Sequence, residues 1–238
     1  MGSSLEKDFL SVPLSRKSMH IYYVRNAILT KLKAALPFFR GRLLDVGCGH
    51  MPYKSIILDS ATNVSDYIGM DLSDNRSYAN KPDLTWDGVV IPLPDSSIDC
   101  AMATEVLEHC PYPDKTLAEI NRVLRPGGTL LITVPFIWML HEVPYDEYRY
   151  TPFALRRLVE SSNFEVLELS ALGGWNASVA QFVANWLYYG EGNRQLMRIG
   201  RVLFFPVFKY LIQRDQVPTE FKTGQMINGL SCLARKKD

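Results

Sequence analysis

Three polar stretches of the sequence hold residue types that bind ligands or move protons. In the first, LLDVGCGHMPY at residues 43–53, Asp45 precedes a turn that contains Gly47 and Gly49. A buried strand that ends in such a turn before a helix presents free backbone N–H groups at the carboxyl edge of a sheet, where open α/β folds bind ligands. We therefore expect a nucleotide-type ligand at this turn.

Two further acids sharpen that expectation. Asp71 follows Gly49 by 22 residues, about the offset at which a carboxylate binds two ribose hydroxyls. Asp87 ends the next apolar run, LTWDG, where it can accept a hydrogen bond from an exocyclic amine. Pro52 stands where a dinucleotide fingerprint has its third glycine, so we expect an adenosine without a pyrophosphate. The structural alternatives are a strand-end acid at Asp45, a helix N-cap at Asp71 and a turn former at Asp87.

The second stretch, TEVLEHC at residues 104–110, predicts a metal site. If the stretch is helical, Glu105, Glu108 and His109 fall at i, i+3 and i+4 and share one face. Two carboxylates and an imidazole attract a divalent cation, which can polarise a substrate hydroxyl. His141 is the candidate for a further ligand. In the alternative interpretation, His109 caps or packs and both glutamates face solvent.

The third stretch, residues 141–158, is dense in groups that can orient a polar substrate. The candidates for this role are Tyr145, Asp146, Tyr148 and Arg149. The alternative is a loop whose aromatic side chains pack on the domain while Thr151 and Pro152 start the next helix.

A sheet with helices around it must position these stretches. Strand-like runs are predicted at residues 42–47, 66–72, 84–88, 98–104, 128–136, 164–170 and 226–236, and helical periodicity at 21–39, 105–110, 114–128 and 151–163. Strands that alternate with helices indicate right-handed crossovers and a mostly parallel sheet, so the fold class is α/β. The Pro-Gly-Gly at residues 126–128 predicts the end of the helix before it.

Residues 171–225 separate the last two strands and have helical periodicity of their own. Within them, Arg194, Arg198 and Arg201 form a basic stripe beside an apolar surface that is too broken to span a bilayer. We expect residues 173–225 to form a helical cap or a homodimer contact. The alternative is peripheral contact with a membrane that carries a lipid-linked substrate.

The composition argues against several classes of protein. Lys plus Arg (26) nearly balances Asp plus Glu (25), so no nucleic-acid partner is expected. The four cysteines lack CxxC pairing, no apolar run reaches the length of a membrane span, and the first residues lack the apolar region of a signal peptide. We therefore expect a cytoplasmic protein.

Four segments resemble class I S-adenosylmethionine-dependent methyltransferases, specifically the small-molecule (type 11) group: LLDVGCGHMPY, YIGMDLS, WDGVVIPLPDSSIDCAMATEVLEH and LAEINRVLRPGGTLLITVP. The resemblance implies S-adenosylmethionine as cofactor and a Rossmann-like, seven-stranded, mostly parallel sheet with helices on both faces. It also implies an antiparallel last strand with a helical insertion before it. The implied single domain, 1–238, comprises an N-terminal helical segment (1–40), a cofactor-binding core (41–170), a helical cap insertion (171–225) and a closing strand (226–238).

By position, the resemblance also assigns the cofactor contacts. It places Asp45, Gly47 and Gly49 around the methionine part, Asp71 on the ribose, Leu72 on adenine and Asp87 at the adenine amino group. The sequence departs from the family pattern at HMP after the turn. The E-x-x-E-H spacing is similar to the metal site of small-RNA 2'-O-methyltransferases and of ubiquinone-pathway O-methyltransferases.

These observations predict methyl transfer to a small-molecule acceptor, preferably to a hydroxyl oxygen. Because the acceptor must then lose a proton, His141 is the first choice for the base and His109 the second. Two alternatives from other classes are a non-catalytic adenosyl-binding or interaction module and an NAD-dependent oxidoreductase. The second alternative would need the missing third glycine.

Overall fold

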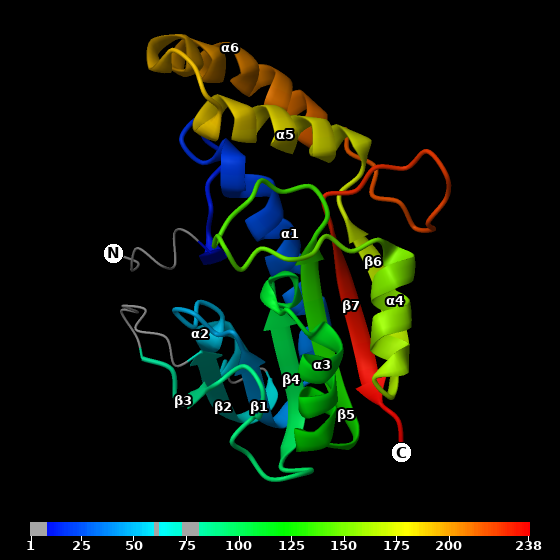
Figure 1. Cartoon of the computed structure of the whole chain (residues 1–238). Coiled ribbons are helices and arrows are strands. Elements are labelled where there is room, and N and C mark those ends of the chain that lie inside the picture. The colour runs from blue at the N-terminus through cyan, green and yellow to red at the C-terminus, as the bar shows by residue number, and fades with distance from the viewer. Residues whose placement is uncertain (1–8, 60–61, 73–80) are drawn as a thin grey trace.

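A seven-stranded sheet forms the centre of the molecule (Figure 1). The computed structural model describes residues 9–59, 62–72 and 81–238. The strands are β1 (Arg40–Val46), β2 (Asn63–Leu72), β3 (Leu84–Trp86), β4 (Ile98–Thr104), β5 (Leu124–Pro135), β6 (Phe164–Leu172) and β7 (Gly229–Lys236). Their order is β3-β2-β1-β4-β5-β7-β6. All neighbours pair in parallel except β7, which is antiparallel to β5 and β6. The predicted Rossmann-like fold is confirmed.

Helices cover both faces of the sheet because its central strands are apolar on both sides. Leu43 of β1 faces a core shared with helix α1 (Met19–Ala35). The next residue, Leu44, faces a core shared with α3 (Pro113–Val123) and α4 (Pro152–Ser161). Successive strand residues thus feed opposite layers, as the alternation of a strand requires.

One predicted helix boundary is wrong. The Pro-Gly-Gly at 126–128 does not end α3, because Leu124 already has an extended backbone and begins β5. Gly128 instead serves a close approach of the backbone. A Cβ on Gly128 would lie 2.8 Å from the Arg125 carbonyl oxygen and 3.0 Å from that of Asp99.

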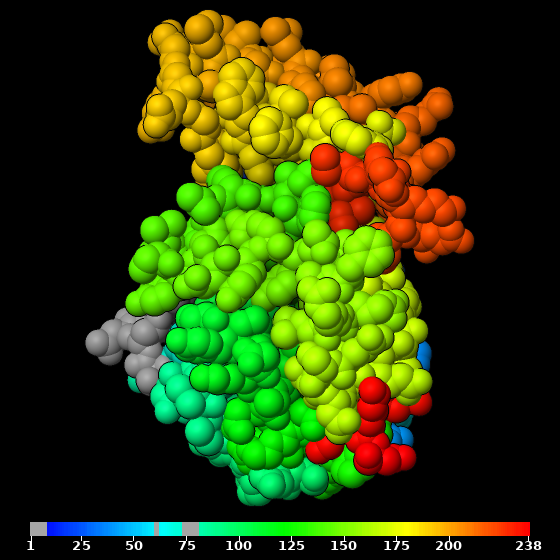
Figure 2. All heavy atoms as spheres, turned by 45° about the vertical axis from the view of Figure 1, so that its right-hand side comes forward, coloured from blue at the N-terminus to red at the C-terminus, as the bar shows by residue number. Residues whose placement is uncertain are grey.

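The long connection between β6 and β7 contains a pair of helices, α5 (Trp175–Tyr189) and α6 (Arg194–Gln213). This helical hairpin forms a layer of its own beyond the carboxyl ends of the parallel strands (Figures 1 and 2). Its inner side packs against Met19 of α1 through Ala180, Ala184 and Phe208. The connection leaves and re-enters the sheet at one point, because Leu172 and Gly229 are cross-strand partners.

Besides this packing, the carboxylate of Asp215 connects the hairpin to the body of the protein. Asp215, just after α6, accepts hydrogen bonds from the backbone N–H groups of Gly174 and Ala177 at the start of α5, both at 2.9 Å. It also accepts one from the Tyr23 hydroxyl of α1 at 3.0 Å. Asp215 therefore caps α5, which has no side-chain cap at Gly174.

Candidate functional site

The glycine turn after β1 is built so that only glycine fits at its first position. Gly47 and Gly49 have φ values of 66° and 50°, in the left-handed region. A Cβ on Gly47 would lie 2.6 Å from Cγ2 of Val106, whereas a Cβ on Gly49 would meet nothing within 4 Å. The turn is therefore packed on one side and open on the other, and the open side has room for a ligand.

Asp71 holds this turn from the end of β2. Its Oδ2 accepts a hydrogen bond from the Gly49 N–H at 2.8 Å, and its Oδ1 accepts one from the Leu72 N–H at 2.7 Å. The predicted ribose carboxylate thus lies directly beside the predicted methionine turn. The alternative role of Asp71 as a helix N-cap concerns residues 73–80, which lie outside the described residues.

Asp45 lies beneath the turn, with only 2% of its surface exposed. The Tyr67 hydroxyl donates a hydrogen bond to its Oδ2. Burial raises the pKa of Asp45 to about 7; the Tyr67 bond opposes this rise and the charge of Asp71 adds to it. Asp45 therefore supports the turn from inside the core and titrates near neutrality.

The third predicted acid, Asp87, is fully exposed and forms a turn. Its Oδ1 accepts hydrogen bonds from the N–H groups of Val89 (2.8 Å) and Val90 (2.9 Å), and these bonds lower its pKa. Leu72, the predicted adenine contact, is 39% exposed, and a Cβ on the neighbouring Gly88 would lie 3.4 Å from its Cδ2. The two predicted adenine contacts are thus at the same edge of the sheet.

The predicted helix over 105–110 is wrong. The Glu105 N–H still donates to the Thr133 carbonyl at 2.9 Å, which prolongs the β4–β5 pairing, and Glu105 itself has a φ of 56°. Only a 3₁₀ turn, η3 (Leu107–His109), follows. The structure therefore does not place Glu105, Glu108 and His109 on one helix face.

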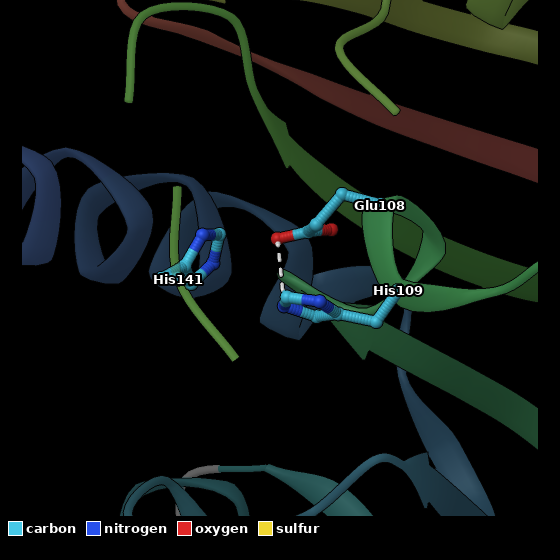
Figure 3. Close-up of side chains that lie close together, drawn as sticks. All are labelled: Glu108, His109 and His141. Carbon is cyan, nitrogen blue, oxygen red and sulfur yellow. Dashed lines mark ion pairs between the residues drawn. The ribbon is translucent and has the colours of Figure 1, made fainter. Parts of the chain in front are cut away.

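The turn nevertheless brings three of the four predicted metal ligands together. One ligand atom each from Glu108, His109 and His141 lies within 4.8 Å of the others (Figure 3). Glu105 is not in this group. His109 Nε2 is 3.8 Å from Glu108 Oε1, and the two imidazole ring centres are 4.6 Å apart.

Glu108 is the electrostatic centre of this group. Its side chain is fully buried, and within the described residues neither carboxyl oxygen has a hydrogen-bond partner. Burial raises the pKa of Glu108 well above its ordinary value, and Glu105 raises it further. Burial also raises the pKa of Glu105. An added cation would remove this penalty, because it would stabilise the ionised carboxylates.

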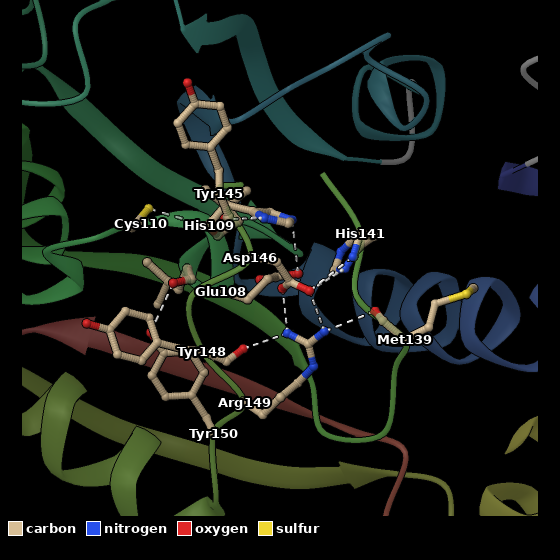
Figure 4. Close-up of polar contacts among 12 residues, drawn as sticks. Glu108, His109, Cys110, Met139, His141, Tyr145, Asp146, Tyr148, Arg149 and Tyr150 are labelled. Atoms are coloured by element: carbon tan, nitrogen blue, oxygen red, sulfur yellow. Dashed lines mark hydrogen bonds and ion pairs between the residues drawn. The ribbon is translucent and has the colours of Figure 1, made fainter. Parts of the chain in front are cut away.

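The loop after β5 carries a network centred on Asp146 (Figure 4). Both carboxyl oxygens of Asp146 accept from the Arg149 guanidinium, at 2.6 and 2.8 Å. Its Oδ2 also accepts from the His141 backbone N–H at 3.0 Å and lies 3.3 Å from His141 Nδ1. Arg149 further donates to the Met139 carbonyl at 3.1 Å. Asp146 and Arg149 thus fix the loop and the His141 ring.

The two tyrosines of the predicted substrate set differ in their surroundings. The Tyr145 side chain is 55% exposed, and its hydroxyl points away from the Asp146 network, while its carbonyl contacts His109 Nδ1 at 2.9 Å (Figure 4). The Tyr148 hydroxyl donates to the Pro111 carbonyl at 3.2 Å, and its ring stacks on Tyr150. The Tyr148 hydroxyl is thus linked to the segment after η3, and the substrate roles of both tyrosines stay predictions.

A family model described as a methyltransferase domain matches residues 20–169. The chain belongs to this family. The matched range contains every cofactor, metal and substrate residue predicted from the sequence, and it ends before the helical hairpin. The family supports an S-adenosylmethionine-dependent methyltransferase of class I over the dehydrogenase alternative.

Relatives and solved structures agree with this assignment. The Mycolicibacterium smegmatis protein named "Probable S-adenosylmethionine-dependent methyltransferase" is 29% identical over 138 residues, which are 52% of this chain and 52% of that protein. The chain therefore spans about half the length of this relative. A SAM-dependent methyltransferase from Archaeoglobus fulgidus has the same fold, with a TM-score of 0.56, 17% identity and 97% of each chain covered.

The fold alone does not decide the reaction. The [4+2]-cyclase SpnF is also similar, with a TM-score of 0.55, 22% identity, and coverage of 90% of this chain and 82% of that one. The reaction of this methyltransferase must therefore be argued from its own residues.

Sequence reasoning missed Tyr67 and the specific contact of Tyr150, which both support the site from a distance. Tyr67 lies under Asp45, and the Tyr150 hydroxyl donates to the Leu107 carbonyl at 3.0 Å and holds the 3₁₀ turn. The parallel register pairs Tyr67 with Leu43, two residues before Asp45. Alternation along the two predicted strands was therefore a usable signal for Tyr67, whereas nothing local indicated the contact of Tyr150.

Proposed function

We propose that this methyltransferase transfers the methyl group of S-adenosylmethionine to a hydroxyl oxygen of a small-molecule acceptor, and that His141 accepts the acceptor proton. The observation that carries the proposal is the contact of the His141 ring with the Asp146 carboxyl group. Val106 packs against Gly47 of that turn, and His109, three residues later, contacts the His141 ring. His141 is thus connected to the glycine turn through His109 and Val106.

Asp146 supports the proposed role by orienting His141. With Nδ1 donating to Asp146 Oδ2, the Nε2 atom keeps its lone pair and can accept a proton. Burial, together with the neighbouring His109, lowers the pKa of His141, so the imidazole is neutral and ready to act at neutral pH. Bound S-adenosylmethionine supplies a methyl group that is already activated, so positioning the acceptor oxygen and removing its proton are the protein's contributions.

We call the edge of the sheet formed by Gly47, Gly49, Asp71 and Leu72 the donor edge. It fits the adenosyl cofactor in three respects. Gly49 is open on the side where a Cβ would point, the Asp71 carboxylate lies next to it, and Leu72 offers an exposed apolar side chain. These features support Asp71 as the ribose ligand and Leu72 as the adenine contact.

The test is methyl transfer from labelled S-adenosylmethionine to a panel of small hydroxyl and amine acceptors. Removal of a general base lowers the rate by roughly 100- to 10,000-fold, which is expected for His141→Ala with unchanged donor affinity. Glu147→Gln, an exposed neighbour in the same loop, is the control. Transfer to amines alone, or a full rate in His141→Ala, would contradict the proposal.

A metal-assisted route is the second candidate. It is favoured by the buried carboxyl group of Glu108, which lies near the imidazoles of His109 and His141 and has no hydrogen-bond partner among the described residues. Glu108, His109 and His141 would hold a divalent cation, which would orient and polarise the acceptor hydroxyl. In that case activity is lost in excess chelator, and Glu108→Gln lowers the affinity for added Mn²⁺ or Zn²⁺ without changing donor binding. Full activity in chelator would leave His141 as a plain base.

A further inference from the structure

The outer face of α5 carries a continuous stripe of large apolar side chains. Its members are Trp175, Val179, Phe182, Trp186 and Tyr189, which follow one another at helical spacing and are 44–66% exposed. Single exposed apolar residues are ordinary, but a stripe that runs the whole length of a helix marks an interaction surface.

The companion helix α6 has a stripe of the same kind. Its members are Leu196, Ile199, Leu203, Val207 and Tyr210, which are 48–69% exposed. The opposite side of α6 is already in use, since Phe204 and Phe208 pack in the core that joins the hairpin to α1. In both helices the apolar stripe lies on the side turned away from that core, so each helix of the hairpin presents an apolar side outward.

The two helices of the hairpin carry charges of one sign only, and the turn between them adds one acid, Glu191. α5 contains no charged residue, and the four charged residues of α6 are all basic: Arg194, Arg198, Arg201 and Lys209. Arg201 turns inward over the Tyr188 ring, at 4.5 Å from its centre. Arg198 and Lys209 are exposed and lie on a different side of α6 from the apolar stripe. This local excess of positive charge stands out in a chain whose overall charge is nearly balanced.

We propose that the α5–α6 hairpin lies flat on a membrane surface that contains anionic lipids. The two apolar stripes enter the boundary between headgroups and acyl chains, and Arg198 and Lys209 pair with lipid phosphates. Trp and Tyr side chains favour this boundary, because one end of the ring is apolar and the other is polar. The hairpin does not cross the bilayer, since no described helix is long and apolar enough to do so.

A second copy of the chain fits this face less well than a lipid surface. A two-fold contact brings the same patch of each copy together. The hairpin would then bring its excess of positive charge close to that of the other copy, and neither helix carries an acidic residue to compensate. Like charges facing each other across an interface cost free energy, so charge complementarity favours the anionic lipid surface.

The test is co-sedimentation of the full chain with vesicles of phosphatidylcholine alone or mixed with phosphatidylglycerol. We expect binding to the mixed vesicles that falls with salt, and weak binding to phosphatidylcholine alone. Phe182→Ser combined with Leu203→Ser is expected to weaken binding by at least about 100-fold, because two large side chains no longer enter the interface. Phe153→Ser on α4, which is 65% exposed, is the matched control and is expected to bind normally.

The charge requirement is tested separately with Arg198→Gln/Lys209→Gln. Loss of two basic residues weakens binding to the mixed vesicles by roughly 20- to 30-fold and leaves binding to phosphatidylcholine unchanged. Donor affinity, measured in each variant, confirms that the fold is intact and makes the result independent of the proposed reaction. The proposal is overturned if the parent protein binds neither vesicle, if the apolar pair binds normally, or if the hairpin variants only abolish self-association.

Discussion

Two regions of the molecule are built in different ways: the glycine turn with Asp71, which is the proposed donor edge, and the His141 loop with the helical hairpin, which is the proposed acceptor side. At the donor edge, Gly47, Gly49 and Asp71 come from the ends of two adjacent parallel strands, and backbone pairing alone brings them together. On the proposed acceptor side, His141 is oriented by its contact with Asp146 in the same loop. The hairpin is joined to α1 by apolar packing and by the hydrogen bond between Tyr23 and Asp215, 192 residues apart. The first region is encoded in short motifs, whereas the second combines contacts within one loop with contacts between distant segments.

At the donor edge, the largest combined loss of stability and donor binding is expected from Gly47→Ala. The new Cβ would combine left-handed backbone strain with a 2.6 Å clash against Val106, for a loss of about 3–4 kcal/mol in unfolding free energy and loss of donor binding. Urea unfolding and calorimetry measure both effects.

Gly127→Ala is the control for that variant, because Gly127 has a similar φ of 71° but open space around its Cβ position. Its cost is expected to be about 1 kcal/mol, and Gly47→Ala/Val106→Ala is expected to regain part of the loss. Equal costs for Gly47→Ala and Gly127→Ala would show that the contact with Val106 does not matter.

The buried carboxyl of Asp45 predicts a pH dependence of stability. Its pKa rises from an ordinary 3.8 to about 7 on folding, so the folded chain holds this proton more tightly than the unfolded chain does. The contribution of Asp45 is fully present below about pH 4 and is lost as pH rises to about 7, by up to about 4 kcal/mol. In Asp45→Asn this part of the slope disappears from urea unfolding measured at a series of pH values; an unchanged slope would show that Asp45 ionises freely.

On the acceptor side, Asp146→Asn is expected to lower kcat by about 10- to 100-fold at unchanged donor affinity. Asparagine cannot form the paired ionic contact with Arg149, so His141 loses its orientation. Glu147→Gln, an exposed neighbour in the same loop, is the control. If donor affinity fell in parallel with kcat, the two regions would not be independent.

The smallest effect is expected from Asp215→Ala, which removes the cap of α5. A lost helix cap costs about 1–2 kcal/mol, and here the loss is confined to the hairpin, so amide exchange in α5 and α6 speeds up while donor binding stays the same. Asp215→Asn keeps an acceptor oxygen and is expected to lose about half as much. Faster exchange across the central sheet as well would mean that the hairpin and the sheet unfold as one unit.

The sequence predicted the sheet well, because the apolar runs before Asp45, Asp71 and Asp87 indicate the strands and the residues that follow indicate the turns. The predicted helix over residues 105–110 was wrong, although Glu105, Glu108 and His109 have helical spacing in the sequence. There the N–H of Glu105 pairs with the neighbouring strand, and a left-handed backbone follows from that pairing rather than from local preference. Propensity reasoning does not include a hydrogen bond to a residue 28 positions away, Thr133.

In the loop after β5 the sequence indicated the residue types but not the contacts between them. His141 and Asp146 were both identified, Asp146 as a substrate-orienting residue, and the structure shows in addition that the Asp146 oxygens contact Arg149 and His141. Which acid pairs with which base in a loop depends on the path of the backbone, and periodicity is silent about that path. The expected metal, membrane contact and cytoplasmic location all remain predictions.

The junction at Leu172 and Gly229 has an evolutionary consequence. Because these two residues are cross-strand partners, the chain leaves the sheet and returns to it at a single rung of the ladder. The segment between them, residues 173–228, can therefore be replaced as one unit, here called a cassette. A change in its length alters the entropy of closing the loop, and this entropic cost grows slowly with length. Descendants of this fold can therefore exchange the cassette for another recognition element while the glycine turn and its two neighbouring acids stay unaltered.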